Sequence, residues 1–107
     1  MISLVTGGCG FIGSHMVDRL LKEGHTVRVI DNWTTGRPEN LEHHKGNPNL
    51  TVNHMDIRNR EEIEPVFEGV DYVFHFAALA DIVPSIQKPW EYYSSNVLGT
   101  YNVVECA

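Results

Sequence analysis

The sequence predicts an α/β fold in which helices flank a parallel β-sheet. Short apolar segments of the length of buried strands alternate with segments in which apolar residues recur at helical spacing. Glycine-rich and polar stretches separate them. A strand, a helix and a second strand fit within residues 1–31, and this βαβ unit of about minimum length makes its two strands parallel.

Residue type and spacing define the first βαβ unit. Residues Ile2–Thr6 are almost all apolar or β-branched, as in a strand that is buried on both faces. Ser14–Glu23 carries apolar residues at helical spacing, and Gly24 is well placed to end this helix. Thr26–Ile30 is the second predicted strand.

The remaining residues continue the same alternation. Asn32–Asn49 is rich in turn-forming residues and is predicted to be mostly loop, with a short helix around Glu39–Lys45. A strand is predicted at Leu50–Asn53, followed by a helix over Arg60–Glu68 that Asn59 caps and Pro65 shortens or bends. The next strand is predicted at Val70–Phe76, followed by a loop over Ala77–Lys88 with one helical turn near Val83–Gln87. The last predicted helix starts at Pro89 and runs through Tyr93, Val97, Tyr101 and Val104.

Two features of the sequence indicate the front portion of a larger protein. The last predicted helix has no stop signal before Ala107. The fourth strand would also be an uncovered edge of an apolar parallel sheet, which natural proteins seldom tolerate. We therefore expect residues 1–107 to be the N-terminal portion of a cofactor-binding domain, with the rest of that domain and a substrate domain beyond them.

Composition narrows the class of protein. The 107 residues, 42% apolar and 21% charged, are enough for one compact domain with a real core. Eight Lys and Arg residues against fourteen Asp and Glu give a net charge of −6, which disfavours nucleic acid and acidic membranes as partners. Cys9 and Cys106 do not form a disulfide framework, and neither a signal peptide nor a membrane span is recognisable, so we expect a cytoplasmic protein.

The strongest motif is the glycine turn TGGCGFIG, residues Thr6–Gly13. In such a turn Gly7 allows the tight bend, Gly10 lets the backbone approach a pyrophosphate, and Gly13 permits close packing of helix on strand. The positive end of the following helix then meets the anion. A buried strand before the turn, an amphipathic helix after it and Asp31 beyond the next strand predict dinucleotide binding. A purely structural glycine turn is the alternative.

Asp31 indicates which dinucleotide is bound. A carboxylate at the end of the second strand accepts hydrogen bonds from the adenosine ribose hydroxyls and repels a 2′-phosphate, so the sequence favours NAD over NADP. The alternative is a turn aspartate in the Asp31–Asn32 pair. Arg28 and Arg37 are near enough in sequence to leave NADP open.

A family resemblance is carried by the glycine turn, Asp31, the Asp56–Ile57 pair and the run HFAALADIVPSIQKPWEYYSSNVLGTYNVVECA. The sequence resembles the extended short-chain dehydrogenase/reductase family over essentially its whole length. Within it, the nearest branch is that of the NAD-dependent nucleotide-sugar epimerases and dehydratases, UDP-hexose 4-epimerases above all. The resemblance implies an incomplete, doubly wound Rossmann-type sheet with strand order 3-2-1-4. It also implies a UDP-sugar as the substrate of the intact protein, and a homodimer formed through helices in the region of Tyr92, Tyr93 and Tyr101.

The resemblance also assigns cofactor-binding residues. Phe11 and Ile12 join Gly7, Gly10 and Gly13 at the pyrophosphate, and the residues around the adenosine ribose are Asp31, Asn32, Thr35 and Gly36. Asp56 and Ile57 lie beside the adenine, and Phe76, Ala77 and Ala78 lie beyond the fourth strand. Ala80 is near the nicotinamide ribose, at a position where hexose epimerases of the bacterial type often carry a lysine.

The family's chemistry uses a tyrosine four positions before a lysine, and this pair is absent from the chain. The residues four places before Lys22, Lys45 and Lys88 are Asp18, Leu41 and Pro84. In the family the tyrosine takes a hydroxyl proton while hydride passes to the nicotinamide. We therefore expect these 107 residues to bind the cofactor without catalysing turnover.

Other candidate residues receive structural interpretations. The strand-end His75 and the helical Asn96 are predicted to support the fold, Ser85 to cap a helical turn, and Lys88 to lie on the surface. The histidines His43, His44 and His54 with Cys9 lack the recurring spacing of a zinc site, so no metal site is predicted. Three other functions stay open: a non-catalytic nucleotide sensor, an S-adenosylmethionine methyltransferase, and a structural half-domain without a tight ligand.

Overall fold

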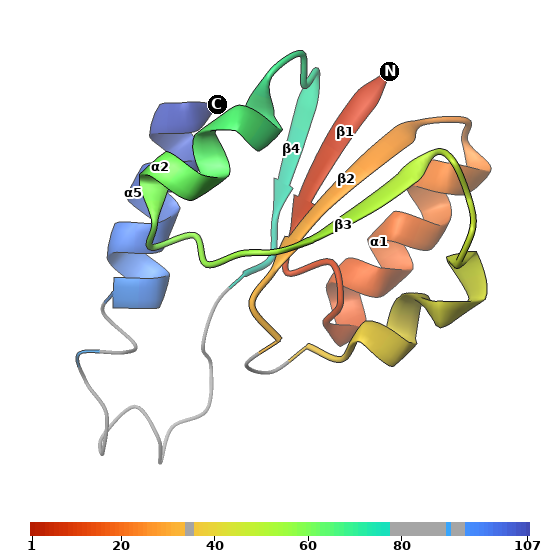
Figure 1. Ribbon diagram of the computed structural model, residues 1–107, viewed down its shortest axis with the longest axis horizontal. Helices are drawn as coiled ribbons and strands as arrows, with labels where there is room; N and C mark the ends of the chain where they lie inside the picture. The colour runs from red at the N-terminus through yellow and green to blue at the C-terminus, as the bar shows by residue number, and fades with distance from the viewer. Residues whose placement is uncertain (34–35, 78–89, 91–93) are drawn as a thin grey trace.

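The computed structural model describes residues 1–33, 36–77, 90 and 94–107, and it contains the predicted parallel sheet (Figure 1). Its strands are β1 (Ile2–Thr6), β2 (Thr26–Asp31), β3 (Leu50–His54) and β4 (Tyr72–His75). The strand order is β3-β2-β1-β4 and every pairing is parallel, which confirms the predicted order 3-2-1-4. The strand β4 is shorter at both ends than the predicted Val70–Phe76.

Helices begin where the local sequence lets them begin. Helix α1 (Phe11–Lys22) starts three residues before the predicted Ser14, because Gly10 has the extended backbone of an N-cap. Helix α2 (Arg60–Ile63) is capped by Asn59, whose side chain accepts a hydrogen bond from the Glu62 amide. The α-helix ends at Ile63, shorter than the predicted Arg60–Glu68, as expected from Pro65, and the chain continues as the 3₁₀ helix η2 (Glu64–Phe67).

Three further helices complete the described residues. The 3₁₀ helix η1 (Pro38–His44) follows β2 in the predicted loop. A π-helical turn η3 (Ser94–Leu98) leads into α5 (Gly99–Cys106). The predicted helical turn at 83–87 and the predicted helix start at Pro89 lie outside the described residues.

Helices cover both faces of the sheet and give two separate cores. On one face α1 and η1 pack on the strands, and the buried residues there are Val5, Cys9, Val17, Leu20, Val27, Val29 and Leu41. On the other face α2, η2 and α5 pack on the strands, and the buried residues are Leu4, Ile30, Ile57, Ile63, Phe67 and Val103. Figure 1 shows helices on both sides of the sheet. Neighbouring strand residues alternate between the two cores, as they must in a sheet that is buried on both sides.

The last helix turns most of its predicted apolar face to solvent. Val97, Tyr101 and Val104, on which its prediction was based, are 53%, 56% and 67% exposed. The buried face of α5 instead carries Asn102 and Val103. Tyr101 is thus not a core residue in the described part of the chain.

No helix among the described residues has both the length and the apolar composition that crossing a bilayer would require.

Candidate functional site

The glycine turn lies where β1 ends and α1 begins, at the carboxyl edge of the sheet. The Gly7 amide donates to the Ile30 carbonyl of β2 at 2.8 Å, and the Gly10 amide donates to the Gly7 carbonyl at 3.0 Å. Gly7 has φ of +70°, a left-handed conformation that favours glycine. The turn is therefore fixed to both central strands, at the edge where ligands of open α/β sheets bind.

The first turn of α1 is open to an anion. Its N-cap, Gly10, makes no side-chain hydrogen bond. The apolar side chains of Phe11 and Ile12, the first two residues of the helix, are 78% and 65% exposed. A Cβ built on Gly10 would meet only the Gly7 carbonyl oxygen, at 3.3 Å. Backbone donors, a positive helix end and open space thus come together at the position predicted for the pyrophosphate.

Asp31 ends β2 and its carboxylate faces the glycine turn. One oxygen, Oδ2, accepts a hydrogen bond from the Cys9 amide at 2.9 Å, and the other, Oδ1, accepts from the Trp33 amide at 2.6 Å. Gly36 lies against the same carboxylate, because a Cβ there would be 2.7 Å from Oδ2. Burial, with the nearby charge of Asp31, raises the pKa of the Cys9 thiol to about 11, so this thiol stays protonated at neutral pH.

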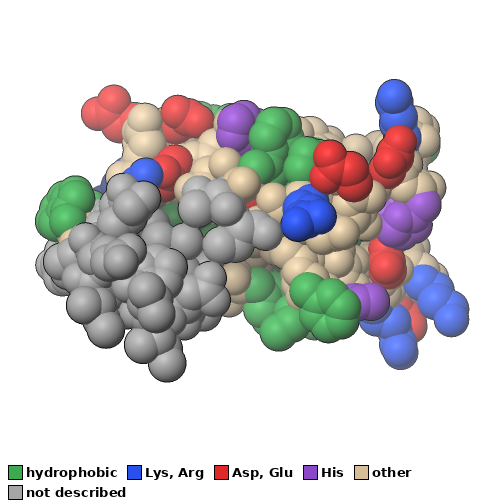
Figure 2. Space-filling model, turned by 90° about the horizontal axis from the view of Figure 1, so that it is seen from below, with side chains coloured by type: hydrophobic (Ala, Val, Ile, Leu, Met, Phe, Trp, Pro, Cys, Tyr) green, Lys and Arg blue, Asp and Glu red, His purple; other side chains and the backbone are tan. Residues whose placement is uncertain are grey.

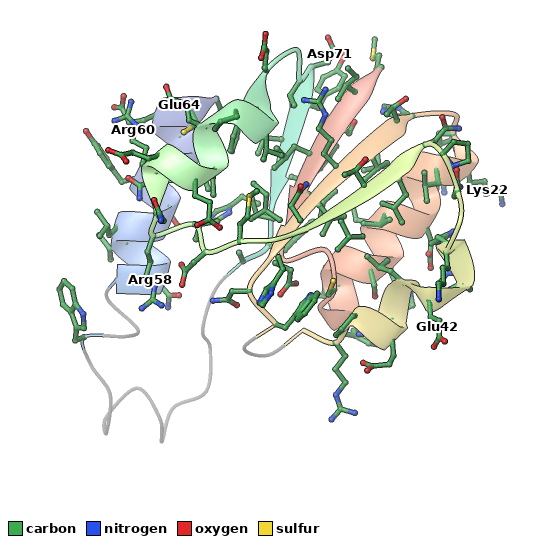
Figure 3. All side chains as sticks on the ribbon, in the orientation of Figure 1. Lys22, Glu42, Arg58, Arg60, Glu64 and Asp71 are labelled. Atoms are coloured by element: carbon green, nitrogen blue, oxygen red, sulfur yellow. The ribbon has the colours of Figure 1, made fainter. Side chains whose placement is uncertain are left out.

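A second acidic group lies beyond β3. The Asp56 carboxylate binds the Arg58 guanidinium, with 2.6 Å between Oδ2 and Nη2, and it also accepts a hydrogen bond from the Asn32 side chain. Partial burial raises the pKa of Asp56, but these bonds outweigh burial and leave that pKa below its ordinary value. Figure 3 labels Arg58 just before α2. Asn32 and Asp56, both predicted site residues, are thus in contact.

At the end of β4, main-chain groups are held by a side chain of β1. The Thr6 hydroxyl oxygen accepts hydrogen bonds from the Phe76 and Ala77 amides at 3.1 and 3.2 Å. Its own hydrogen is left for His75, whose Nδ1 lies 2.5 Å away. The other ring nitrogen of His75, Nε2, then donates to the Thr100 hydroxyl at 2.8 Å. His75 therefore joins β1, β4 and α5, which agrees with its predicted structural role.

Comparison with known proteins identifies the family. The family model for the NAD dependent epimerase/dehydratase family matches residues 3–107. The chain belongs to this family. It is 43% identical over 104 residues to UDP-glucuronic acid decarboxylase 2 of Arabidopsis thaliana, covering 97% of this chain and 22% of the relative. It is 39% identical over 107 residues to UDP-glucose 4-epimerase of Halalkalibacterium halodurans, covering 98% of this chain and 30% of the relative.

Solved structures agree with this assignment. The dTDP-glucose 4,6-dehydratase DesIV of Streptomyces venezuelae, solved with NAD bound, superimposes with a TM-score of 0.92 at 38% identity. The match covers all of this chain and 35% of the dehydratase. The Rossmann-type fold and the predicted cofactor, NAD, are thus those of the family. The chain spans about a third or less of the length of these relatives.

The predicted cofactor-binding residues of this family member fall into three groups. The first consists of residues that line the carboxyl edge: Gly7, Gly10, Phe11, Ile12, Gly13, Asp31, Asn32, Gly36, Asp56, Phe76 and Ala77. The second is Ile57, whose side chain is buried in the core while its backbone remains at the edge. Thr35, Ala78 and Ala80 lie outside the described residues.

Sequence reasoning missed three residues that shape this edge. The side chain of Asn102 is buried and donates to the carbonyls of Ile57 and Arg58 at 3.0 and 3.1 Å, so it fixes the segment after Asp56. The rings of Trp33 and His54 stack with their centroids 3.9 Å apart. An aromatic residue so soon after Asp31 was the available signal for this pair, whereas nothing local marks Asn102.

Acid should weaken the fold through His75. Burial lowers the pKa of His75, and its Nδ1 must stay unprotonated to accept from Thr6. A lowered pKa in the folded state gives a stabilising contribution that is present above the ordinary histidine value of 6.5 and is lost as pH falls below it. Urea unfolding at pH 7.5 and 5.5 should thus give a larger loss of stability for the wild type than for His75→Gln. An equal loss in both proteins would contradict this role.

Proposed function

We propose that this chain binds NAD and supplies the cofactor-binding, N-terminal part of a nucleotide-sugar epimerase. The observation that carries the proposal is the uncapped N-terminus of α1 beside the Asp31 carboxylate. These two features match the two chemically distinct parts of an adenine dinucleotide, namely its diphosphate and its ribose. The family assignment supports the same ligand.

The residues of the site fit NAD. The open surface above Gly10 leaves room for the diphosphate, and the backbone amides that begin α1 supply donors. Each Asp31 oxygen already accepts one backbone hydrogen bond and has a lone pair left for a ribose hydroxyl. We assign the adenine to the segment after β3, where Asn32 and Asp56 meet. When bound, NAD would supply a temporary acceptor for hydride taken from the sugar and then returned to it.

Arg28 supports the choice of NAD over NADP. Its guanidinium Nη1 donates to the carbonyls of Val66 and Glu68 at 2.9 and 2.5 Å, where η2 ends. Arg28 thus holds the main chain at the end of η2 and has a structural role there. Asp31, with its negative charge, remains at the ribose position.

Relatives suggest the substrate class. The names of the epimerase and the decarboxylase reported above indicate UDP-sugar substrates. We propose that the protein containing this chain also acts on a UDP-sugar. A dehydratase is the second candidate, favoured by the likeness to DesIV. A nucleotide sensor without catalysis is the third, and it would be recognised if the intact protein lacked the tyrosine and lysine pair.

Two further proposals concern the assembled protein. The exposed apolar side chains of Val97 on η3 and of Tyr101 and Val104 on α5 support the predicted homodimer, since a partner helix would remove them from water. Light scattering should then give the mass of a dimer. The free cysteines Cys9 and Cys106 support a reducing compartment such as the cytoplasm.

Calorimetric titration with NADH, NADPH and S-adenosylmethionine tests the ligand. We expect NADH to bind most tightly. Tighter binding of S-adenosylmethionine would overturn the dinucleotide assignment, because methyltransferases also use a glycine turn followed by an acid.

A further inference from the structure

Helix α1 and the 3₁₀ helix η1 bring two histidines to one carboxylate. The Nε2 atoms of His43 and His44 lie 2.8 and 2.5 Å from the same oxygen, Oδ1, of Asp18. The ligand atoms of the three residues all lie within 4.8 Å of one another. This end of the molecule carries histidine, acidic and basic side chains close together (Figure 2).

Contacts outside the cluster hold both elements in place. Val17, next to Asp18, and Leu41, on η1, are buried in the same core. The Asn40 side chain of η1 donates to the Cys9 carbonyl of the glycine turn at 2.7 Å. Core packing and the hydrogen bond to the glycine turn thus hold the two helices together, and they place the three polar side chains side by side.

The electrostatics of the cluster favour a cation. A carboxylate is negatively charged at neutral pH, and both imidazole rings of the cluster face the carboxylate of Asp18. The neighbouring Arg19 is turned to Glu23, with 2.9 Å between Nε and Oε1, so its charge is already paired. Lys22 and Glu42 come from the same two helices and add opposite charges (Figure 3).

We propose that Asp18, His43 and His44 bind a divalent transition-metal ion, Zn²⁺, through one carboxylate oxygen and two imidazole nitrogens. Imidazole and carboxylate are zinc ligands, and three protein ligands leave a fourth position for water. That position is accessible, because the side chains of His43 and Asp18 are 57% and 40% exposed. Any proton on Nε2 moves to Nδ1 or to solvent when the metal binds.

Zinc binding requires the three side chains to rearrange. Ligands about 2.1 Å from zinc lie roughly 3.0 to 3.4 Å apart at right or tetrahedral angles. The present nitrogen-to-oxygen distances are 2.5 and 2.8 Å, and the three ligand atoms spread over as much as 4.8 Å, so the half-exposed carboxylate has to move outward and the imidazole rings have to turn toward a common centre. No zinc-site spacing is recognisable in the sequence because the third ligand is Asp18, which is far from the histidine pair in the chain.

Zinc at this position would link α1 directly to η1. The η1 segment also holds the glycine turn, since the Arg37 amide donates to the Cys9 carbonyl at 2.9 Å. Metal binding should therefore stabilise the folded chain around the turn. This effect is independent of the proposed NAD binding.

Calorimetric titration with ZnCl₂ tests the site, in the protein as its gene encodes it, without an affinity tag and after dialysis against EDTA. We expect one site per chain that weakens by about tenfold or more in Asp18→Asn and in His44→Gln, because each variant removes one ligand. The control His15→Gln removes an exposed histidine from α1 and should bind zinc like the wild type. Absence of binding, or equal weakening in the control, would overturn the proposal.

Thermal unfolding provides the second measurement. Zinc should raise the melting temperature of the wild type, EDTA should reverse the rise, and the double variant His43→Gln/His44→Gln should show no rise. Asp18→Asn keeps the size of the side chain and an acceptor oxygen, so we expect circular dichroism to show that this variant is folded. It therefore provides the test if the double variant does not fold. A zinc-dependent rise of equal size in Asp18→Asn would place the metal elsewhere.

Discussion

Gly13→Ala should destabilise the fold by about 3 kcal/mol or more, the upper range for an added atom that its surroundings cannot accommodate. A Cβ at Gly13 would lie 2.0 Å from the Gly7 carbonyl oxygen and 2.8 Å from its carbon. Both atoms are backbone and are fixed by the hydrogen bond of the Gly7 amide to Ile30. Helix α1 would have to move away from the turn. The measurement is urea unfolding, with a lower midpoint at an unchanged slope.

Gly10→Ala is the matched control for this prediction. A Cβ at Gly10 would meet the Gly7 carbonyl oxygen at 3.3 Å, which needs a shift of only a few tenths of an ångström. We expect Gly10→Ala to cost much less stability than Gly13→Ala, yet to weaken NADH binding because the new methyl group occupies the diphosphate surface. Equal destabilisation by the two variants would show that the close contact at Gly13 is not what requires glycine there.

Much of the fold follows from local sequence. Apolar β-branched runs predicted all four strands, and the alternation with helices predicted that they run parallel, whereas the order 3-2-1-4 was implied by the family resemblance. Pro65 and Asn59 fixed the end and the start of α2 for reasons that involve only neighbouring residues. The glycine spacing and Asp31 likewise identified the carboxyl edge, because each glycine has a steric role within the turn.

Contacts between residues far apart in the chain could not be predicted in this way. The Asn102 side chain holds a segment about 45 residues away, and the histidine pair meets an aspartate on another helix. The exposed face of α5 was missed for a related reason: helical spacing identifies an apolar face but not whether the chain itself covers it. Such features depend on how helices and strands pack against one another, and the periodicity of the sequence carries no information about that packing.

Asp31 has two roles that the sequence presented as alternatives. Its carboxylate accepts from the Trp33 amide two residues on, which is the turn geometry, and from the Cys9 amide in the glycine turn. Asp31→Ala should therefore cost about 1 to 3 kcal/mol of stability, because the buried Cys9 amide loses its acceptor. The same variant should weaken NADH binding by about 1 to 3 kcal/mol, the usual range for a lost charged hydrogen bond.

Asp31→Asn tests the ribose role through the ratio of two affinities. The amide oxygen can accept from only one of the two backbone amides that Asp31 binds, a loss that affects both dinucleotides, while the charge that would repel a 2′-phosphate is removed. That repulsion is worth about 1 to 4 kcal/mol at contact in a partly solvated site. Calorimetry should therefore give weaker NADH binding, stronger NADPH binding, and a preference for NADH that falls by about tenfold or more. If both dinucleotides lose affinity by the same factor, Asp31 acts only by shaping the turn, and the ribose assignment is wrong.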